Sequence, residues 1–474
     1  MVLEANGGSR SSPAAGAGGM AVHGHRLSTV VPSSVTGEAV DYELADADLL
    51  HKLHYLRAVH VFRAPGGDAA ALTVRALKEP MFPWLDLYFP VAGRLRRRDV
   101  VTGGDGGSAG EGGAAVGEAG RPYVRCNDCG VRIVEVDCDA TVDEWLKEEA
   151  ERGGQCGMLS YDKVIGPELF FSPLLYAQIT SFKCGGIAVG FTWAHLIGDI
   201  PSAAACFSAW AHLVSGKKPL HPTLRDDPSA VPPLAPPGGV KPPPPVKVTA
   251  APVGDHWAVP TRHDMEHFSF HVTEQQLEAL QRGVPKGGSS HVGPFELVAA
   301  LMWRALDAIR GGAEGEEEAT RTVTVVKAGD EPARIGGGRG LSNEHRIIHV
   351  AAPGSAAEAS DVAKLAALLA GAGAHRTDEA GAAAAVAAGG ADVVVYGANL
   401  TFVDAGGVDV YGGVELAGRR PAHVEYAVGG VGDGGAAVVH RDAGGRGRAV
   451  AAVVRRGEAD RLRVALRDAL RVVA

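Results

Sequence analysis

The stretch that decides the fold is Ile187-Ala-Val-Gly-Phe-Thr-Trp-Ala-His195-Leu-Ile-Gly-Asp199-Ile-Pro201-Ser202. Large and small side chains alternate through its first half, which is the period of a strand with one crowded face. A glycine and a proline then interrupt the alternation, and apolar residues recur beyond them at helical spacing. We therefore predict a strand that turns directly into a helix, with His195 and Asp199 together on the connection.

His195 has two interpretations at this point. A histidine at the end of a strand can be held by its neighbours and still reach a cleft, as a general base must. A lone histidine in such a place is also often structural. Asp199, followed by Ile200-Pro201, has the spacing of a helix N-cap. Position alone leaves both interpretations open.

The length and the patterning predict an α/β protein of two domains. The chain has 474 residues, and helical and strand patterns interleave through both halves. This predicts two α/β sandwiches, each a mixed sheet flanked by helices. Apolar spacing predicts helices over Asp46–Tyr55 and Leu72–Phe89, and Thr273-Glu-Gln-Gln276 has the pattern of a capping box that opens a helix. The domain boundaries follow from composition. We predict a disordered tail over 1–24, an N-terminal domain over 25–214, a proline-rich crossover linker over 215–262 and a C-terminal domain over 263–474.

The composition and the cysteine spacing exclude several kinds of partner and site. The net charge is −9, without blocks of lysine or arginine, so we expect no nucleic-acid partner. No charge-free apolar run approaches the ~18 residues of a membrane helix, so we expect no transmembrane span. The N-terminus has no secretion-signal pattern, which predicts reduced cysteines. Cys126-Asn-Asp-Cys129 has metal spacing but no second pair beside it, and His263 and His267 fall on a strand pattern, so we expect no metal.

Three segments together resemble one family. His195-Leu-Ile-Gly-Asp199 resembles the HxxxD motif of the BAHD acyltransferases, the plant acyl-CoA-dependent family. Tyr88-Phe-Pro-Val-Ala-Gly-Arg-Leu95 is similar to the YPLAGRL segment of that family, and Phe295-Glu-Leu-Val-Ala-Ala-Leu-Met-Trp-Arg304 is similar to its second-half helix. The proline-rich stretch matches the family's crossover between domains.

The resemblance implies a two-domain fold like that of chloramphenicol acetyltransferase, with a channel between the domains. It implies that His195 is the general base, which deprotonates an alcohol or amine that attacks an acyl-CoA thioester. Asp199 would have a structural, orienting role. Acyl-CoA would be the substrate or ligand, and no metal, prosthetic group or other cofactor would be required.

Departures from the family pattern lie on both sides of the predicted site. Ile200 stands where the family usually has glycine, and Asp409-Val-Tyr-Gly-Gly413 replaces the DFGWG segment, without its tryptophan. We expect Asp409 and Gly413 to keep the structural part of that motif. Upstream, at an altered aromatic position, we expect Asn399 and Thr401 to contact substrate.

These departures resemble the Eceriferum/Glossy-type clade, which is linked to surface wax. Thr29–Glu38, Lys52–Arg57 and Asn399–Asp404 are the other segments that resemble it. The clade implies very-long-chain fatty acyl elongation for cuticular wax, in concert with the ketoacyl-CoA synthase of the elongase. The location would be the cytosolic face of the endoplasmic reticulum or the cytoplasm. In that setting the acyltransferase motif can be dispensable.

Two functions from different classes therefore remain open. The favoured one is a non-catalytic accessory to acyl elongation on an acyltransferase scaffold. The alternative is a catalytic acyl-CoA-dependent O- or N-acyltransferase with His195 as its base. A peptide-forming condensation domain is disfavoured, because its motif carries two adjacent histidines and Ala194 occupies the first of those places.

Overall fold

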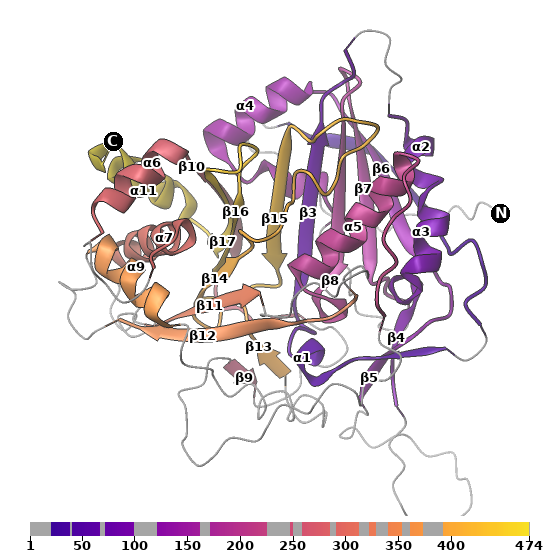
Figure 1. Cartoon of the computed structure of the whole chain (residues 1–474), viewed down its shortest axis with the longest axis horizontal. Coiled ribbons are helices and arrows are strands. Elements are labelled where there is room, and N and C mark those ends of the chain that lie inside the picture. The colour runs from indigo at the N-terminus through magenta and orange to yellow at the C-terminus, as the bar shows by residue number, and fades with distance from the viewer. Residues whose placement is uncertain are drawn as a thin grey trace, which may run out of the picture.

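Two six-stranded mixed sheets lie side by side, with helices packed against them (Figure 1). This is the α/β architecture that the patterning predicts. The computed structural model describes residues 20–37, 40–66, 72–98, 121–161, 171–224, 247–249, 258–284, 291–311, 322–328, 340–352, 361–372 and 392–473. Within these residues no helix is both long and apolar enough to cross a bilayer.

The first sheet carries the motif strand near its middle. Its strand order is β1 (Val22–Val30), β6 (Val131–Cys138), β7 (Leu175–Phe182), β8 (Ile187–Ala194), β3 (Tyr55–Phe62) and β15 (His423–Gly429). Only β6 and β7 run parallel. The motif strand β8 is buried along its whole length. Helix α5 (Ile200–Val214) packs on it, and the rings of Phe191 and Phe207 stack with centroids 4.1 Å apart. The predicted strand-to-helix turn is confirmed.

The second sheet forms the other half of the molecule. Its order is β10 (Met265–Val272), β17 (Arg448–Arg455), β16 (Ala436–Arg441), β14 (Leu400–Asp404), β11 (Thr322–Ala328) and β12 (His345–Ala351). Strand β14 runs parallel to both of its neighbours. Within the described residues four helices lie beside this sheet: α6 (Glu274–Arg282), α7 (Pro294–Arg310), α9 (Val362–Gly371) and α11 (Ala459–Val473) (Figure 1). The capping box predicted at Thr273 opens α6, as its side chain accepts from the Gln276 N–H.

Smaller elements complete the fold. The short strands form two further sheets: β2 (Asp41–Glu43), β5 (Pro122–Arg125) and β4 (Arg94–Arg97), and β9 (Lys247–Thr249) with β13 (Asp392–Val394). The first half also contains the following described helices: α1 (Asp46–Leu49), α2 (Val74–Lys78), α3 (Met81–Leu87), α4 (Val142–Arg152), and the 3₁₀ turns η1 (Phe89–Ala92), η2 (Gln155–Leu159) and η3 (His195–Ile197).

Two predicted helices were too long. The pattern over Asp46–Tyr55 predicted one helix, but α1 ends at Leu49 and β3 begins at Tyr55. Because β3 pairs with both β8 and β15, sheet hydrogen bonds outweigh the local helical spacing there. The helix predicted over Leu72–Phe89 divides into α2 and α3, with Pro80 at the cap between them.

The second half contributes a strand to the first sheet. Strand β15 pairs antiparallel with β3, from His423 opposite Val61 to Gly429 opposite Tyr55. The predicted C-terminal domain, 263–474, is therefore not confined to the second sheet. At the other end, β1 begins at Val22, inside the predicted tail, because pairing with β6 orders residues that composition alone does not. Residues 1–19 and most of the predicted linker lie outside the described residues.

Candidate functional site at the end of the motif strand

His195 lies where β8 ends and η3 begins. Its backbone N–H donates to the His54 carbonyl at 3.1 Å. The indole N–H of Trp193 donates to the Gly198 carbonyl at 2.9 Å, which closes the tight turn. His195 is only 1% exposed. The connection therefore holds the imidazole firmly, but it holds it inside the protein.

Asp199 is the N-cap of α5, as its spacing predicts. One carboxylate oxygen accepts from the Ser202 N–H at 3.0 Å, and the other accepts from the Glu344 N–H at 3.1 Å. The Asp199 N–H donates to the Ser342 carbonyl at 3.0 Å. These bonds join the start of α5 to the segment that precedes β12. Asp199 thus orients the loop of His195 through backbone groups of both halves of the chain.

The Asn343 side chain also holds the loop of His195, and no sequence motif had indicated this residue. Its side-chain N–H₂ donates to the His195 carbonyl at 3.0 Å and to the Asp48 carboxylate at 3.1 Å. Because Asp48 lies in α1, Asn343 connects three separate segments at one point. The backbone of His195 is therefore fixed from two sides.

The His195 ring lies in a cluster of aromatic and imidazole rings. It stacks on His51 with centroids 4.5 Å apart and planes 19° from parallel, and His345 meets His51 edge-on at the same distance. Burial lowers the pKa of His195 well below its usual value, and the nearby His345 and His54 lower it further. His195 is therefore neutral at pH 7.

His54 closes one side of this cluster. Its Nδ1 donates to the Gly430 carbonyl at 2.8 Å, and its Nε2 accepts from the Val395 N–H at 3.0 Å. Burial lowers the pKa of His54 to about 4. Both ring nitrogens are occupied by backbone groups, so His54 is a structural histidine.

Tyr396 occupies the position that a reacting hydroxyl would need. Its Oη lies 2.8 Å from Nε2 of His195, and the two rings are tilted with centroids 5.2 Å apart. Burial raises the pKa of Tyr396 well above its usual value, so the phenol keeps its proton. A general base must lie about 2.6–3.2 Å from the proton that it removes. In either tautomer, Nε2 of His195 is engaged by Tyr396.

The His195 ring also lies near its own carbonyl and the Asn343 side chain, but its second nitrogen makes no regular hydrogen bond with them. Its Nδ1 is buried and has no hydrogen-bond partner among the described residues. A catalytic histidine is usually oriented by a hydrogen bond to that second nitrogen. The arrangement therefore supplies neither a free Nε2 nor an oriented Nδ1.

Two cavities open between the two halves of the molecule, and His195 lines neither. One, of about 350 Å³, has walls from the end of α1 into β3, from 258–267 and from the end of β15. His54 and Tyr55 line it, so it passes beside the ring cluster. The other, of about 780 Å³, lies between α4, α11 and β15.

The remaining predicted residues build turns. The Thr401 hydroxyl donates to the Asn399 carbonyl at 2.9 Å and accepts from the Gly397 N–H at 3.2 Å, and neither Asn399 nor Thr401 lines either cavity. The Asp409 side chain accepts a backbone N–H of its own turn at 2.8 Å, and its carbonyl accepts from Gly413 at 3.1 Å. Asp409 and Gly413 thus bond to each other within one turn, while the structural role of that motif and substrate contact by Asn399 and Thr401 both stay predictions.

The fold and the motif turn define the class of protein. A profile of the Transferase family matches residues 20–327, and the chain belongs to this family, the BAHD acyltransferases. Among its relatives are proteins of Arabidopsis thaliana called ECERIFERUM. ECERIFERUM 26-like is 36% identical over 337 residues, which cover 70% of each chain. ECERIFERUM 2 is 33% identical over 422 residues, 87% of this chain and 90% of the other.

Solved structures show the same fold. Vinorine synthase superposes with a TM-score of 0.63 at 18% identity, covering 95% of this chain and 98% of its own. F. graminearum TRI101, complexed with coenzyme A and deoxynivalenol, superposes with a TM-score of 0.62 at 14% identity, covering 90% and 97%. The predicted two-domain acyltransferase fold is confirmed.

Proposed function

We propose that this chain acts in very-long-chain fatty acyl elongation for cuticular wax, as an accessory to a ketoacyl-CoA synthase and not as an acyltransferase. The observation that carries the proposal is the contact of Tyr396 with Nε2 of buried His195, 2.8 Å apart. The similarity to ECERIFERUM proteins supports the wax-related part of the proposal.

The proposed accessory binds an acyl-CoA and works beside the elongase at the cytosolic face of the endoplasmic reticulum. We expect the acyl group in the cavity of about 350 Å³, which passes beside the ring cluster although His195 does not line it. No proton is taken from an acceptor in this role, so the engaged Nε2 of His195 is no obstacle. Attachment to the membrane would come through the synthase.

The second candidate is acyl-CoA-dependent transfer to a hydroxyl or amine. It is favoured by the intact turn, in which Asp199 and Asn343 hold the backbone of His195. For this chemistry Tyr396 would have to leave Nε2 before an acceptor could bind there. Loss of a general base costs about 10²–10⁴-fold in rate.

Complementation of a wax-deficient plant distinguishes the accessory function from the catalytic one. A wax-deficient plant receives the wild-type chain, His195→Ala, or no chain, and wax chain length is measured. Under the accessory function, His195→Ala restores wax chain length as the wild type does, and it still co-purifies with the synthase from microsomes. A folded His195→Ala protein that accumulates normally but fails to restore chain length would overturn the proposal and support catalysis.

A further inference from the structure

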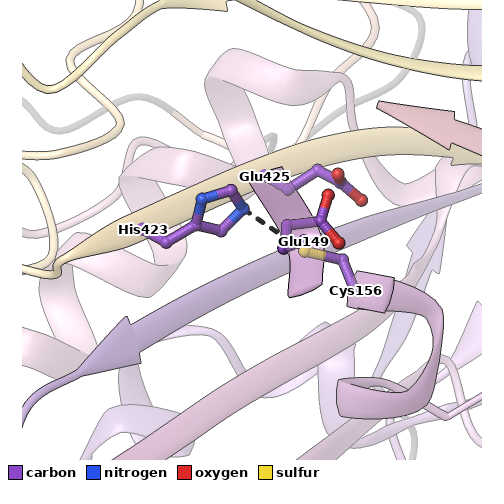
Figure 2. A group of neighbouring side chains, drawn as sticks. All are labelled: Glu149, Cys156, His423 and Glu425. Atoms are coloured by element: carbon purple, nitrogen blue, oxygen red, sulfur yellow. Dashed lines mark hydrogen bonds between the residues drawn. The ribbon is translucent and has the colours of Figure 1, made fainter. Parts of the chain in front are cut away.

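Four side chains with metal-binding chemistry meet where α4 and η2 approach β15 (Figure 2). Glu149 comes from the last turn of α4, Cys156 from η2, and His423 and Glu425 from β15. One ligand atom of each lies within 4.8 Å of every other. The Cys156 Sγ and the His423 Nε2 are 3.4 Å apart. None of these residues contributes to the His195 cluster.

The fold directs each side chain toward this point. His423 and Glu425 are two residues apart on a strand and therefore share one face. Helix α4 ends in Gly153 and Gly154, both with positive φ, and the chain turns back so that Cys156 faces Glu149. Only glycine adopts this backbone without strain. This turn therefore places the Cys156 thiol beside the carboxylate of Glu149, seven residues earlier in the chain.

The Glu149 carboxylate is fixed by backbone groups. It accepts from the Gly154 N–H at 3.2 Å and the Gln155 N–H at 2.6 Å, and the Ser269 hydroxyl also donates to it. Carboxylate ligands of metals are commonly oriented by such hydrogen bonds. Oε1 accepts two of these bonds and Oε2 accepts one, so Oε2 keeps a lone pair for a metal ion.

We propose that Glu149, Cys156, His423 and Glu425 bind one zinc ion. Zinc takes sulfur, nitrogen and oxygen ligands in a tetrahedron. Bond lengths of about 2.0–2.3 Å give ligand–ligand edges of roughly 3.3–3.8 Å. The Cys156–His423 separation of 3.4 Å is already such an edge, and the widest separation needs to close by about 1 Å, within the reach of side-chain rotation.

Charge and access favour a cation at this point. The carboxyls of Glu149 and Glu425 lie close together in one largely buried volume, where a bound cation would offset their mutual repulsion. Zinc binding releases the protons of the Cys156 thiol and of any protonated carboxyl to solvent. The ligands then carry −3 and the metal +2, and the Arg57 guanidinium acts on Glu425 with the opposite charge. The cavity of about 780 Å³ is lined by Glu149, His423 and Glu425 and gives the ion a path from solvent.

Metal analysis of the purified full chain tests the proposal. The protein is loaded with zinc, desalted and measured by mass spectrometry, and cobalt is then bound in place of zinc. We expect one zinc per chain and the charge-transfer absorption of a cobalt thiolate. Cys156→Ser and Glu425→Gln should each weaken zinc binding by at least ~10-fold, and Cys156→Ser should remove the cobalt–thiolate band.

Cys138→Ser is the matched control, since Cys138 is also buried but lies at the end of β6, outside the cluster. It should keep both zinc and the cobalt band. Circular dichroism establishes that each variant is folded, and Glu425→Gln preserves size if Cys156→Ser does not fold. Wild-type chain that retains no zinc, or zinc and a thiolate band that persist in folded Cys156→Ser, would refute the site. Neither result depends on the proposed function, because His195 is not involved.

Discussion

Replacing Tyr396 by phenylalanine removes one hydroxyl and leaves the ring in place, so it measures the contact on which the proposed function depends. In the wild type that hydroxyl lies 2.8 Å from Nε2 of His195, and both residues are buried. Its loss leaves a buried ring nitrogen without a partner, which costs about 1–3 kcal/mol of unfolding free energy. In a His195→Ala background the hydroxyl has already lost this partner. There the same substitution should cost nothing or stabilise the protein.

The assay is urea unfolding of the four proteins of this cycle, followed by circular dichroism and tryptophan fluorescence. Tyr426→Phe is the matched control, because the Tyr426 hydroxyl is buried and has no hydrogen-bond partner among the described residues. By the same reasoning as for the His195→Ala background, Tyr426→Phe should leave the unfolding free energy unchanged or raise it, and should not lower it. If Tyr396→Phe costs the same with and without His195, the hydroxyl does not bind the imidazole, and the argument that Nε2 is engaged fails.

Three other substitutions or conditions probe the fold. Gly190→Ala would place a Cβ against the backbone carbonyl of η2 and should destabilise by about 3 kcal/mol, whereas Gly407→Ala meets open space and should be tolerated in the same thermal unfolding assay. Glu458→Gln breaks a buried two-bond ion pair with Arg310, at 2.7 and 2.8 Å, and should cost about 3–5 kcal/mol in urea unfolding. The pKa of buried His54 is about 4 in the folded protein, against an ordinary value of 6.5, so the unfolded chain binds the proton first as the pH falls. The contribution of His54 to the unfolding free energy should be fully present above pH 6.5 and fall by about 3 kcal/mol on acidification to pH 4. Other buried histidines add to the total loss, so His54→Gln should reduce the loss measured across that range by about this amount.

Signals confined to a few residues predicted structure well. The alternation from Ile187, the Asp199 cap and the Thr273 capping box each depend on neighbours within one turn or strand, and all three are present in the structure. The wrong predictions concern where helices end. The helix was predicted to continue to Tyr55, because the apolar spacing of one segment carries no information about distant strands. In the structure Tyr55 begins β3, which pairs with β8 and β15.

The decisive contacts of the site could not be predicted in this way. Tyr396 meets His195 across 201 residues, and Asn343 meets it across 148. The expectation of no metal had the same limit, because it considered Cys126 and Cys129, which are close in sequence. The cluster that offers metal ligands instead joins Cys156 to His423, 267 residues later, through the strand that crosses into the first sheet.

The HxxxD motif makes structural contacts here that involve no proton transfer. Asp199 caps α5 and accepts the Glu344 N–H, so its replacement by alanine should cost about 0.5–2 kcal/mol for the cap alone, whatever His195 does. The His195 carbonyl accepts from the Asn343 side chain, and the His195 N–H donates to the His54 carbonyl. Both bonds use backbone atoms, so any residue at position 195 could form them. The motif therefore maintains the junction between the two halves of the fold. Of the groups in this motif, only the His195 imidazole would act directly in acyl transfer. Its Nε2 is hydrogen-bonded to the Tyr396 hydroxyl.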